Sequence, residues 1–386
     1  MSHKDPEVSV VMSVHNDAIY LKESVESILN QDFSDFELII IDDFSSDNSW
    51  DLLTSYAQRD SRIVLIKNTE NLKLAASLNR GLAIAKGKYI ARMDGDDIAL
   101  PSRLTEQVDY METHSKVVLV STGVLYIDEE GNSLREYFPP LNALVLQWQL
   151  IFCSPLRHPS VLWRRERVQA TVGGYNPTDL YSQDFRFFCA ISKQFKIETL
   201  PKVLLKMRLR AGAVSTAKRQ QQDDFAALIT YQQLDTYFEA APLSLDEKID
   251  LRSLLRRYHP LQQQTFHTLT AGRFTQAVAH YVTLFANFCS VYQSDIDSKQ
   301  ANLLYAEIEH SLPSLIRHAV RQGWPRAALQ IISTYLSRYP QRSLPVIQRL
   351  IGYLGYYSLR TIKPLSAVLT KVRQFYYKSK RDQQYS

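Results

Sequence analysis

At 386 residues, the chain exceeds the roughly 100 to 200 residues of a typical domain, and its length predicts two domains. The apolar content of 45% is ordinary for a globular protein, and three unevenly spaced cysteines argue against a structural zinc site and for a reducing compartment. The net charge of +5 combines 32 basic and 39 acidic residues before Ser311 with 13 basic residues and one acid from Ser311 onward. A basic tail on an acidic body indicates contact with an anionic partner.

The first part of the chain alternates between apolar runs and helical spacing. Strands are expected at residues 8–12, 38–41, 63–66, 89–93, 117–121 and 203–209. Helices are expected at residues 21–29, 45–56, 75–86, 101–111 and 184–193. This alternation predicts an α/β fold with a mostly parallel, Rossmann-like sheet covered by helices. After Ala217 the pattern becomes helical, so we expect one domain at residues 1–216 and an all-α domain at residues 217–386.

Acidic residues follow two of the predicted strands. They are Asp42, Asp43, Asp94, Asp96 and Asp97. In an open α/β sheet, ligands bind beyond the carboxyl ends of the strands, so these carboxylates are expected to face a ligand. Carboxylates that converge on one crevice repel each other unless a cation lies among them. A divalent ion bound to a nucleotide diphosphate satisfies that requirement.

Each acidic group also has a purely structural interpretation. Asp42, Asp43 and Ser45 precede a predicted helix, where such residues cap the helix N-terminus. The carboxylate of Asp43 can instead accept a hydrogen bond from a uracil ring or a ribose hydroxyl, and the two roles can coexist. A lone DxD motif is commonly a solvated turn, but this one follows a buried strand, and Gly95 permits the backbone to approach a ligand closely.

Five segments together make the sequence resemble glycosyltransferase family 2, a family of inverting enzymes with the GT-A fold. These segments are VSVVMSVHN at residues 8–16, ELIIIDDFSSD at 37–47, NLKLAASLNRG at 71–81, GKYIARMDGDD at 87–97 and LPSRL at 100–104. The resemblance is confined to the N-terminal half of the chain. It implies that this half carries the GT-A fold.

The resemblance also implies roles for particular residues. The residues implied in nucleotide binding are Ser13, His15, Asp42, Asp43, Lys73, Asn79, Asp94 and Arg210. The DxD motif implies a Mn²⁺ or Mg²⁺ ion, with Asp94 and Asp96 as its protein ligands. His158 and Gln183 lie in segments that resemble the acceptor side of the family's site. Asp184 is implied as the general base, because an attacking hydroxyl must lose its proton; a helix N-terminal acid is the structural alternative.

Three positions depart from the family's pattern. Lys73 stands where glycine is frequent, and Gln183 replaces the acidic neighbour of the base. Arg210 stands where the family frequently has the histidine of an Arg-x-His sequence. Because a guanidinium has no lone pair for a metal, Arg210 either contacts the diphosphate, which would weaken the need for metal, or is a surface strand residue.

The ends of the chain bear on its location. Residues 1–7 are charged and the apolar run 8–14 is too short for a secretory signal, which predicts a cytoplasmic protein. Two uncharged stretches, residues 137–156 and 274–294, contain prolines or several polar side chains and predict buried helices rather than membrane spans. The basic, aromatic tail suits either the anionic inner face of a membrane or packing on the rest of the protein. Nothing indicates binding to nucleic acid.

The sequence therefore predicts an inverting glycosyltransferase that moves a sugar from a nucleotide sugar, by default a UDP-sugar, to a hydroxyl. The acceptor would be a glycan, a lipid-linked carrier or a protein. The altered Gln183 and Arg210 motivate an alternative, a non-catalytic scaffold that binds a nucleotide sugar and recruits a partner through its helical domain.

Overall fold

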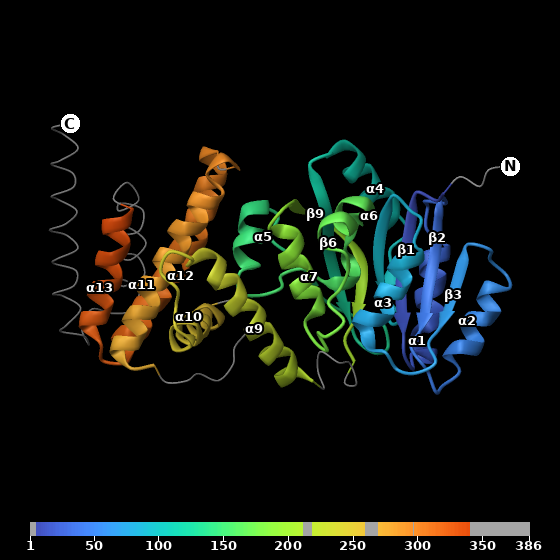
Figure 1. The fold of residues 1–386 in the computed structure, drawn as a ribbon, viewed down its shortest axis with the longest axis horizontal. Helices are drawn as coiled ribbons and strands as arrows, with labels where there is room; N and C mark the ends of the chain where they lie inside the picture. Colours follow the sequence, from blue (N-terminus) through green and yellow to red (C-terminus); the bar gives the residue numbers. More distant parts are fainter. Residues whose placement is uncertain (1–4, 211–217, 259–268, 296, 340–386) are drawn as a thin grey trace. The chain divides into compact units, whose positions relative to one another are not determined.

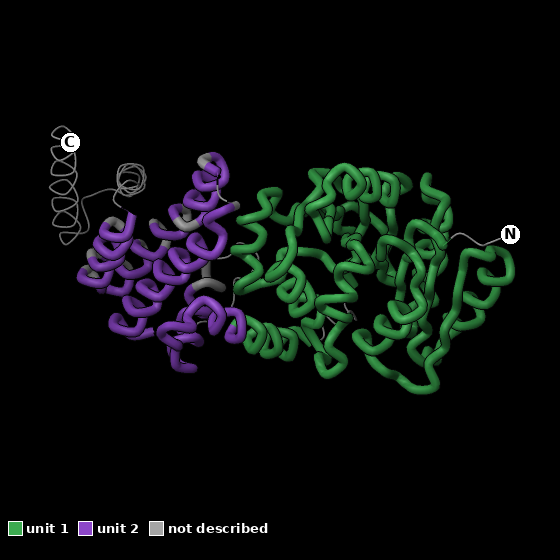
Figure 2. Tube along the Cα trace, turned by 45° about the horizontal axis from the view of Figure 1, so that its top comes forward, with its two compact units in different colours: residues 1–230 green, residues 231–386 purple. Residues whose placement is uncertain are grey.

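A computed structural model describes residues 5–210, 218–258, 269–295 and 297–339. The chain divides into two compact units, Met1–Thr230 and Tyr231–Ser386 (Figure 2). The predicted site residues all lie in the first unit.

The first unit is built on one sheet, whose strands alternate with helices along the chain (Figure 1). The strands are β1 (Val8–Val14), β2 (Phe36–Asp42), β3 (Ile63–Lys67), β4 (Tyr89–Asp94), β5 (Ile98–Ala99), β6 (Val117–Ile127), β7 (Ser133–Tyr137), β8 (Leu162–Arg164) and β9 (Lys196–Arg208). Their order across the sheet is β3-β2-β1-β4-β8-β6-β9-β5, and β7 pairs with β6.

Strand order reverses direction between β1 and β4. From β1 the chain moves outward to β2 and β3, then crosses back to place β4 on the other side of β1. All these strands run parallel, with β1 paired to both β2 and β4. Such a reversal opens a crevice at the carboxyl ends of the two central strands, where α/β proteins bind ligands.

Helices cover both faces of the sheet. The helices of this unit are α1 (Ala18–Leu29), α2 (Ser49–Ala57), α3 (Lys73–Ile84), α4 (Arg103–Thr113), α5 (Ala143–Gln149), α6 (Arg165–Thr171), α7 (Gln183–Ser192) and the short η1 (His158–Ser160). Apolar residues of α1, α2 and α4 share one core with one face of the sheet, and those of α3, α5, α6 and α7 share a second core with the other face. Since β1 and β2 are covered on both sides, their sequences are nearly continuous apolar runs.

The α/β fold with a mostly parallel sheet, followed by helices, is confirmed, and short antiparallel strands make the sheet mixed. β8 pairs antiparallel with β4 and β6, and β5 pairs antiparallel with β9. These strands are only three and two residues long, too short for a periodic signal in the sequence. Long-range pairing, rather than local propensity, makes them strands.

The division between the units falls within helix α9 (Arg219–Tyr237), whereas the sequence pattern changes after Ala217. The beginning of α9 belongs to the first unit because Ile229 is fully buried in the core that contains α7. Thr230 adds a hydrogen bond from its hydroxyl to the carbonyl of Phe152. A change of periodicity therefore marks where helices begin and not where the core ends.

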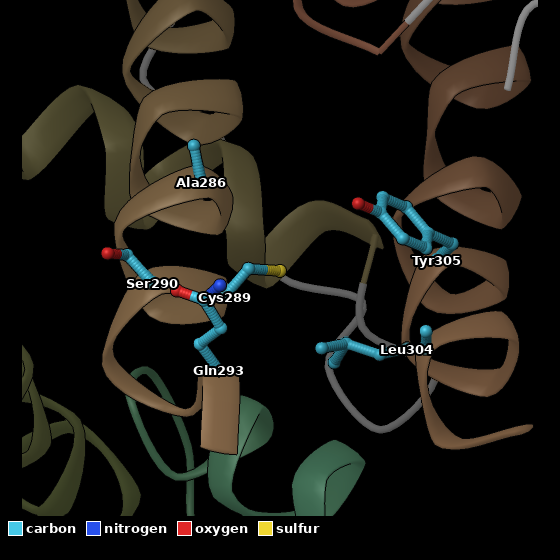
Figure 3. Close-up of a pocket in the computed structure, with 7 residues that line it drawn as sticks. Ala286, Cys289, Ser290, Gln293, Leu304 and Tyr305 are labelled. Carbon is cyan, nitrogen blue, oxygen red and sulfur yellow. The ribbon is translucent and has the colours of Figure 1, made fainter. Parts of the chain in front are cut away.

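The described part of the second unit is helical. After α9 its elements are α10 (Leu245–Tyr258), α11 (Ala271–Val291), η2 (Gln293–Asp295), α12 (Ser298–Arg321) and α13 (Pro325–Arg338). A cavity of about 380 Å³ lies between α11 and α12, and Figure 3 shows Cys289 and Tyr305 projecting towards each other across it. Among the described residues, no helix has the length and apolarity needed to cross a membrane. The basic, aromatic residues from Arg349 to Arg381 lie outside the described residues.

Gly87, in the turn before β4, is expected to tolerate no side chain. A Cβ at this position would lie 2.4 Å from the amide nitrogen of Ser9 and 2.7 Å from the carbonyl carbon of Val8, both backbone atoms of a central strand. Gly87→Ala should therefore lower the free energy of unfolding by about 1–3 kcal/mol, measured by urea denaturation. Gly272→Ala is the control, since nothing lies within 4 Å of its Cβ and alanine favours the helix. Equal stability of the two variants would contradict the prediction.

Candidate functional site

The strand register brings the predicted residues of β1, β2 and β4 to one edge of the sheet. Ser13 lies beside Asp94 in the β1–β4 pair, and Val14 lies beside Asp42 in the β1–β2 pair. The chain leaves each strand at this edge, so the loops that follow meet around the β1–β4 crevice. Two groups of acids that are far apart in the sequence are therefore neighbours in the fold.

Asp43 organises the loop that leads into helix α3. One carboxylate oxygen accepts hydrogen bonds from the side chain of Asn68 at 2.7 Å and the amide of Leu72 at 2.8 Å, and the other accepts from the amide of Lys73 at 3.0 Å. Asp43 thus caps helix α3 and not the helix that follows β2, for which the sequence predicted the capping role. The carboxylate of Asp43 sets the position of the loop at residues 68–73 beside the site.

Asp42 and His15 flank this carboxylate. Asp42 is fully buried, with one oxygen accepting from the amide of Ser45 at 3.4 Å and the other without a hydrogen-bond donor. The exposed ring of His15 contacts the carbonyl of Asp43 at 2.8 Å through Nδ1 and lies 3.2 Å from the amide of Asn71 through Nε2. His15 is the more accessible of the two to a ligand, while Asp42 lies beneath the surface.

Lys73 adopts the left-handed conformation, with φ of +71°. Only glycine adopts this conformation without steric cost, which explains physically why glycine suits the position. The side chain is exposed at the start of α3, and the backbone amide is held by Asp43. The structure therefore shows a backbone role for this position and leaves the ammonium group at the surface.

Each carboxylate of the DxD motif is paired with an arginine. Asp94 forms an ion pair with Arg92, two residues earlier on the same face of β4. Asp96 lies 2.7 Å from Nε of Arg210, whose Nη2 donates to Asp17 at 2.6 Å. Arg210, just beyond β9, thereby joins the DxD loop to the loop after β1.

Gly95 allows this arrangement. A Cβ at position 95 would lie 2.9 Å from a carboxylate oxygen of Asp17. A side chain at position 95 would therefore require the carboxylate of Asp17 to shift, and that carboxylate contacts Arg210 through its other oxygen. Glycine between the two acids avoids this shift.

Several acids at this edge have raised pKa values. Burial raises the pKa of Asp96 to about 6, with the charge of Asp94 adding to the effect and Arg210 opposing it. Burial also raises the pKa of Asp17, again against the influence of Arg210. Asp97 is fully buried, its pKa is raised well above the ordinary value, and it accepts from the amide of Arg208. These acids therefore bind a proton more readily than free carboxylates do.

The predicted metal ligands do not form a donor set for Mg²⁺ or Mn²⁺ as they lie here. Such ions need several oxygen ligands, whereas Asp94 and Asp96 each face a guanidinium. Over the described ranges, no group of three or more His, Cys, Asp or Glu side chains could hold a metal ion. The divalent ion remains a prediction from the sequence.

Tyr175 forms the centre of the predicted acceptor side. Its backbone amide donates to the side-chain oxygen of Asn79 at 2.9 Å, and its carbonyl accepts from the same side-chain amide at 2.8 Å. Nε2 of His158 lies 2.7 Å from the Tyr175 hydroxyl. Burial lowers the pKa of His158 well below its usual range, so its imidazole is neutral. Asn79 and His158 therefore position Tyr175 rather than face outward.

Asp184 lies in the first turn of α7, next to the buried Gln183. The helix starts after Ser182, which has a positive φ of 54°. Burial raises the pKa of Asp184, while the amide of Phe185 and the guanidiniums of Arg92 and Arg157 oppose the shift. A helix N-terminus stabilises a carboxylate, so this residue can accept a proton when ionised.

Arg92 links the two halves of the site. It is buried on the α7 face of β4, pairs with Asp94, and is an electrostatic neighbour of both Asp184 and Tyr175. Asp94 and Asp184 also both act on the Tyr175 hydroxyl, raising its pKa together with burial. The DxD motif and the predicted base therefore occupy one region of the fold.

Two residues of this region were not among the sequence predictions, Asp17 and Arg92, whereas Tyr175 lies in a segment that the sequence assigned to the acceptor side. Asp17 lies in a loop, where spacing carries no information about contacts. Arg92 gave a usable signal, since a charged residue inside a strand buried on both faces requires a partner. That signal points directly to the acid two residues later.

Comparison with known proteins gives a consistent result. The model of the family described as "Glycosyl transferase family 2" matches residues 9–163. An uncharacterised glycosyltransferase of Methanocaldococcus jannaschii is 37% identical over 239 residues, covering 60% of this chain and 82% of the relative. The WfaP protein of Escherichia coli, a UDP-Glc:α-D-GlcNAc-diphosphoundecaprenol β-1,3-glucosyltransferase, is 38% identical over 217 residues, covering 55% of this chain and 80% of the relative.

Among solved structures, residues 1–349 of Staphylococcus aureus TarS in complex with UDP-GlcNAc resemble this chain with a TM-score of 0.50. The sequence identity is 17%, and the match covers 82% of this chain and 92% of the TarS chain. The likeness is one of fold, and it confirms the GT-A fold that the sequence predicts.

Replacing Arg103 with methionine should cost more stability than replacing Arg92. Both side chains are buried, but the ion-pair partner of Arg92 is the partly exposed carboxylate of Asp94, which water can solvate when the arginine is removed. Arg103 instead donates to Gln107, to the Arg92 carbonyl and to the sulfur of Met93. Buried acceptors that lose their donor cost about 1–3 kcal/mol each.

We therefore expect Arg92→Met to lower the free energy of unfolding by about 1 kcal/mol, and Arg103→Met to lower it by about 2–4 kcal/mol. Urea denaturation of both variants at the same pH measures the difference. A larger loss of stability in Arg92→Met than in Arg103→Met would contradict this prediction.

Proposed function

Since the chain belongs to glycosyl transferase family 2 and is a glycosyltransferase, we propose that it transfers a sugar from a UDP-sugar to a hydroxyl with inversion at the anomeric carbon. The acceptor we propose is a growing glycan on a lipid-linked carrier, in the synthesis of a surface polysaccharide. Support for the donor and the acceptor comes from WfaP, whose name gives UDP-Glc and a diphosphoundecaprenol-linked sugar. The amylovoran biosynthesis relative AmsE of Erwinia amylovora, 31% identical over 215 residues, supports a polysaccharide product.

The observation that carries this proposal is the shared neighbourhood of Asp94 and Asp184. The strand register brings Ser13 and Asp94 to the crevice where the strand order reverses, and Asp184 lies at the start of α7 beside the same Arg92. A nucleotide can therefore bind at the strand ends while an acceptor hydroxyl approaches the carboxylate of Asp184. The strand ends would bind the leaving nucleotide, and Asp184 would take the proton of the attacking hydroxyl.

The proposed step is a single displacement. The acceptor oxygen forms a bond to the anomeric carbon while the bond from that carbon to the diphosphate oxygen breaks, and the electron pair leaves with UDP. The proton of the acceptor hydroxyl moves to the carboxylate of Asp184. Asn79 and His158 hold Tyr175 in place beside this carboxylate. This step uses no divalent ion. Contact of the basic tail with a membrane remains a prediction from the sequence.

Asp184→Asn should lower the rate of transfer by about 10²–10⁴-fold, because the amide cannot accept the proton. The affinity for UDP, measured by calorimetry, should change little, since the nucleotide binds at the strand ends. The assay is a screen of nucleotide sugars for release of UDP or GDP, with oligosaccharide and lipid-linked acceptors. Glu166→Gln, an exposed acid on α6, is the control. No release from any donor would overturn the enzymatic proposal, and unchanged turnover in Asp184→Asn would remove this residue as the base.

In the pH profile of kcat/KM, the acidic limb should lie at a higher pH than it would for a base with the usual pKa of an aspartate. Burial raises the pKa of Asp184. Because a base must be deprotonated to act, the acidic limb of the kcat/KM profile shifts to higher pH. Arg157 opposes that shift, and Arg157→Gln should therefore move the limb to still higher pH. Arg157→Lys keeps the positive charge and should leave the limb near its original position. A limb that moves down, or equally in both variants, would contradict the assignment.

A further inference from the structure

Arg210 occupies the position between the loop after β1 and the DxD loop. Its Nε lies 2.7 Å from a carboxylate oxygen of Asp96, and its Nη2 donates to Asp17 at 2.6 Å. The guanidinium also lies 5.8 Å from the centre of the Tyr20 ring, on the first turn of α1. One cation thus contacts three segments that surround the end of the β1–β4 crevice.

The second arginine of this region completes the charge pairing. Arg92 pairs with Asp94, so Asp17, Asp94 and Asp96 each contact a guanidinium. Asp97 is fully buried and accepts a hydrogen bond from the amide of Arg208, and Arg92 also acts on it electrostatically. Arg208 in turn pairs with Glu23 through Nη2. The carboxylates that a divalent ion would join are therefore already joined by protein cations.

A guanidinium and a divalent ion act on phosphate oxygens in different ways. The ion needs lone pairs from carboxylates, which a guanidinium cannot supply. A guanidinium instead donates N–H bonds from a planar fork that fits phosphate oxygens, and it keeps its charge at any pH relevant to the protein. Arg210 is partly exposed, with 27% of its side chain accessible, whereas Arg92 is buried. Of the two arginines, Arg210 is the one that a diphosphate can reach.

We propose that Arg210 takes the place of the divalent ion, so that sugar transfer proceeds without a bound metal. This inference rests on the proposed function. As the bond between the anomeric carbon and the diphosphate oxygen breaks, the electron pair and negative charge pass to UDP, and the guanidinium of Arg210 stabilises that charge. The carboxylates of Asp17 and Asp96 hold the guanidinium at the crevice. The acceptor's proton goes to Asp184 as before.

The first experiment uses the unaltered protein. Its transfer rate after removal of metals and in excess EDTA should stay within about twofold of the rate with added Mn²⁺ or Mg²⁺. Loss of transfer in EDTA and its recovery with Mn²⁺ would overturn the proposal. This test needs no variant, so poor folding of a variant cannot obscure it.

The second experiment measures binding in variants of Arg210. Without metal, Arg210→Ala should weaken UDP binding by about 10- to 100-fold, the loss expected for a hydrogen bond between charged groups. Arg210→His should show the same loss in EDTA and recover affinity with Mn²⁺, because an imidazole has a lone pair for the ion. Paramagnetic resonance should detect Mn²⁺ binding to Arg210→His and not to the original protein. UDP affinity equal to the original in Arg210→Ala, without metal, would overturn the proposal.

Arg62→His is the matched control. Arg62 is also ion-paired with an aspartate, Asp60, and packs on the ring of Phe36, but it lies before β3 and away from the strand ends. Arg62→His should bind UDP with the affinity of the original protein, and added Mn²⁺ should not change that affinity. Because the binding experiments need no sugar transfer, they separate a failure of this inference from a failure of the proposed function. The latter would appear as no nucleotide release with or without metal.

Discussion

The convergence of like charges at one sheet edge governs the architecture of this protein. Parallel pairing of β1 with β2 and β4 makes the acids after these strands neighbours, whatever their separation in the sequence. Ionised carboxylates so close together would repel one another by several kcal/mol in a partly buried site. The fold meets this constraint with arginines from within β4 and from the end of β9. The end of β9 thereby brings Arg210 to Asp17, in the loop after β1.

Much of this architecture could be predicted from local sequence. The apolar runs before Asp42 and Asp94 gave strands and their order of appearance, and the parallel fold then placed both acids at one edge. Strands β5 and β8 could not be predicted, because partners distant in the sequence create them. The ion pairs of Arg210 with Asp17 and Asp96 were hidden for the same reason. Arg210 was recognisable as unusual, but its contact with Asp17 depends on two loops meeting in space.

The predicted nucleotide and acceptor residues divide into groups that face the crevice and groups that support it. His15 is exposed and Arg210 is partly exposed at the crevice. The polar atoms of Asn79, His158 and Asp43 instead form hydrogen bonds with the backbone or side chains of neighbouring loops. Sequence motifs do not separate these groups, because both are fixed by the same fold. The supporting residues set the loop positions within which the proposed reaction has to occur.

The contact between Gly95 and Asp17 ties two positions of the chain to each other's evolution. A side chain at position 95 would require the carboxylate at position 17 to shift, so the cost of enlarging this spacer residue depends on what stands at position 17. A smaller residue at position 17 would lower that cost but would also remove a partner of the guanidinium. Substitutions at the two positions are therefore expected to be non-additive.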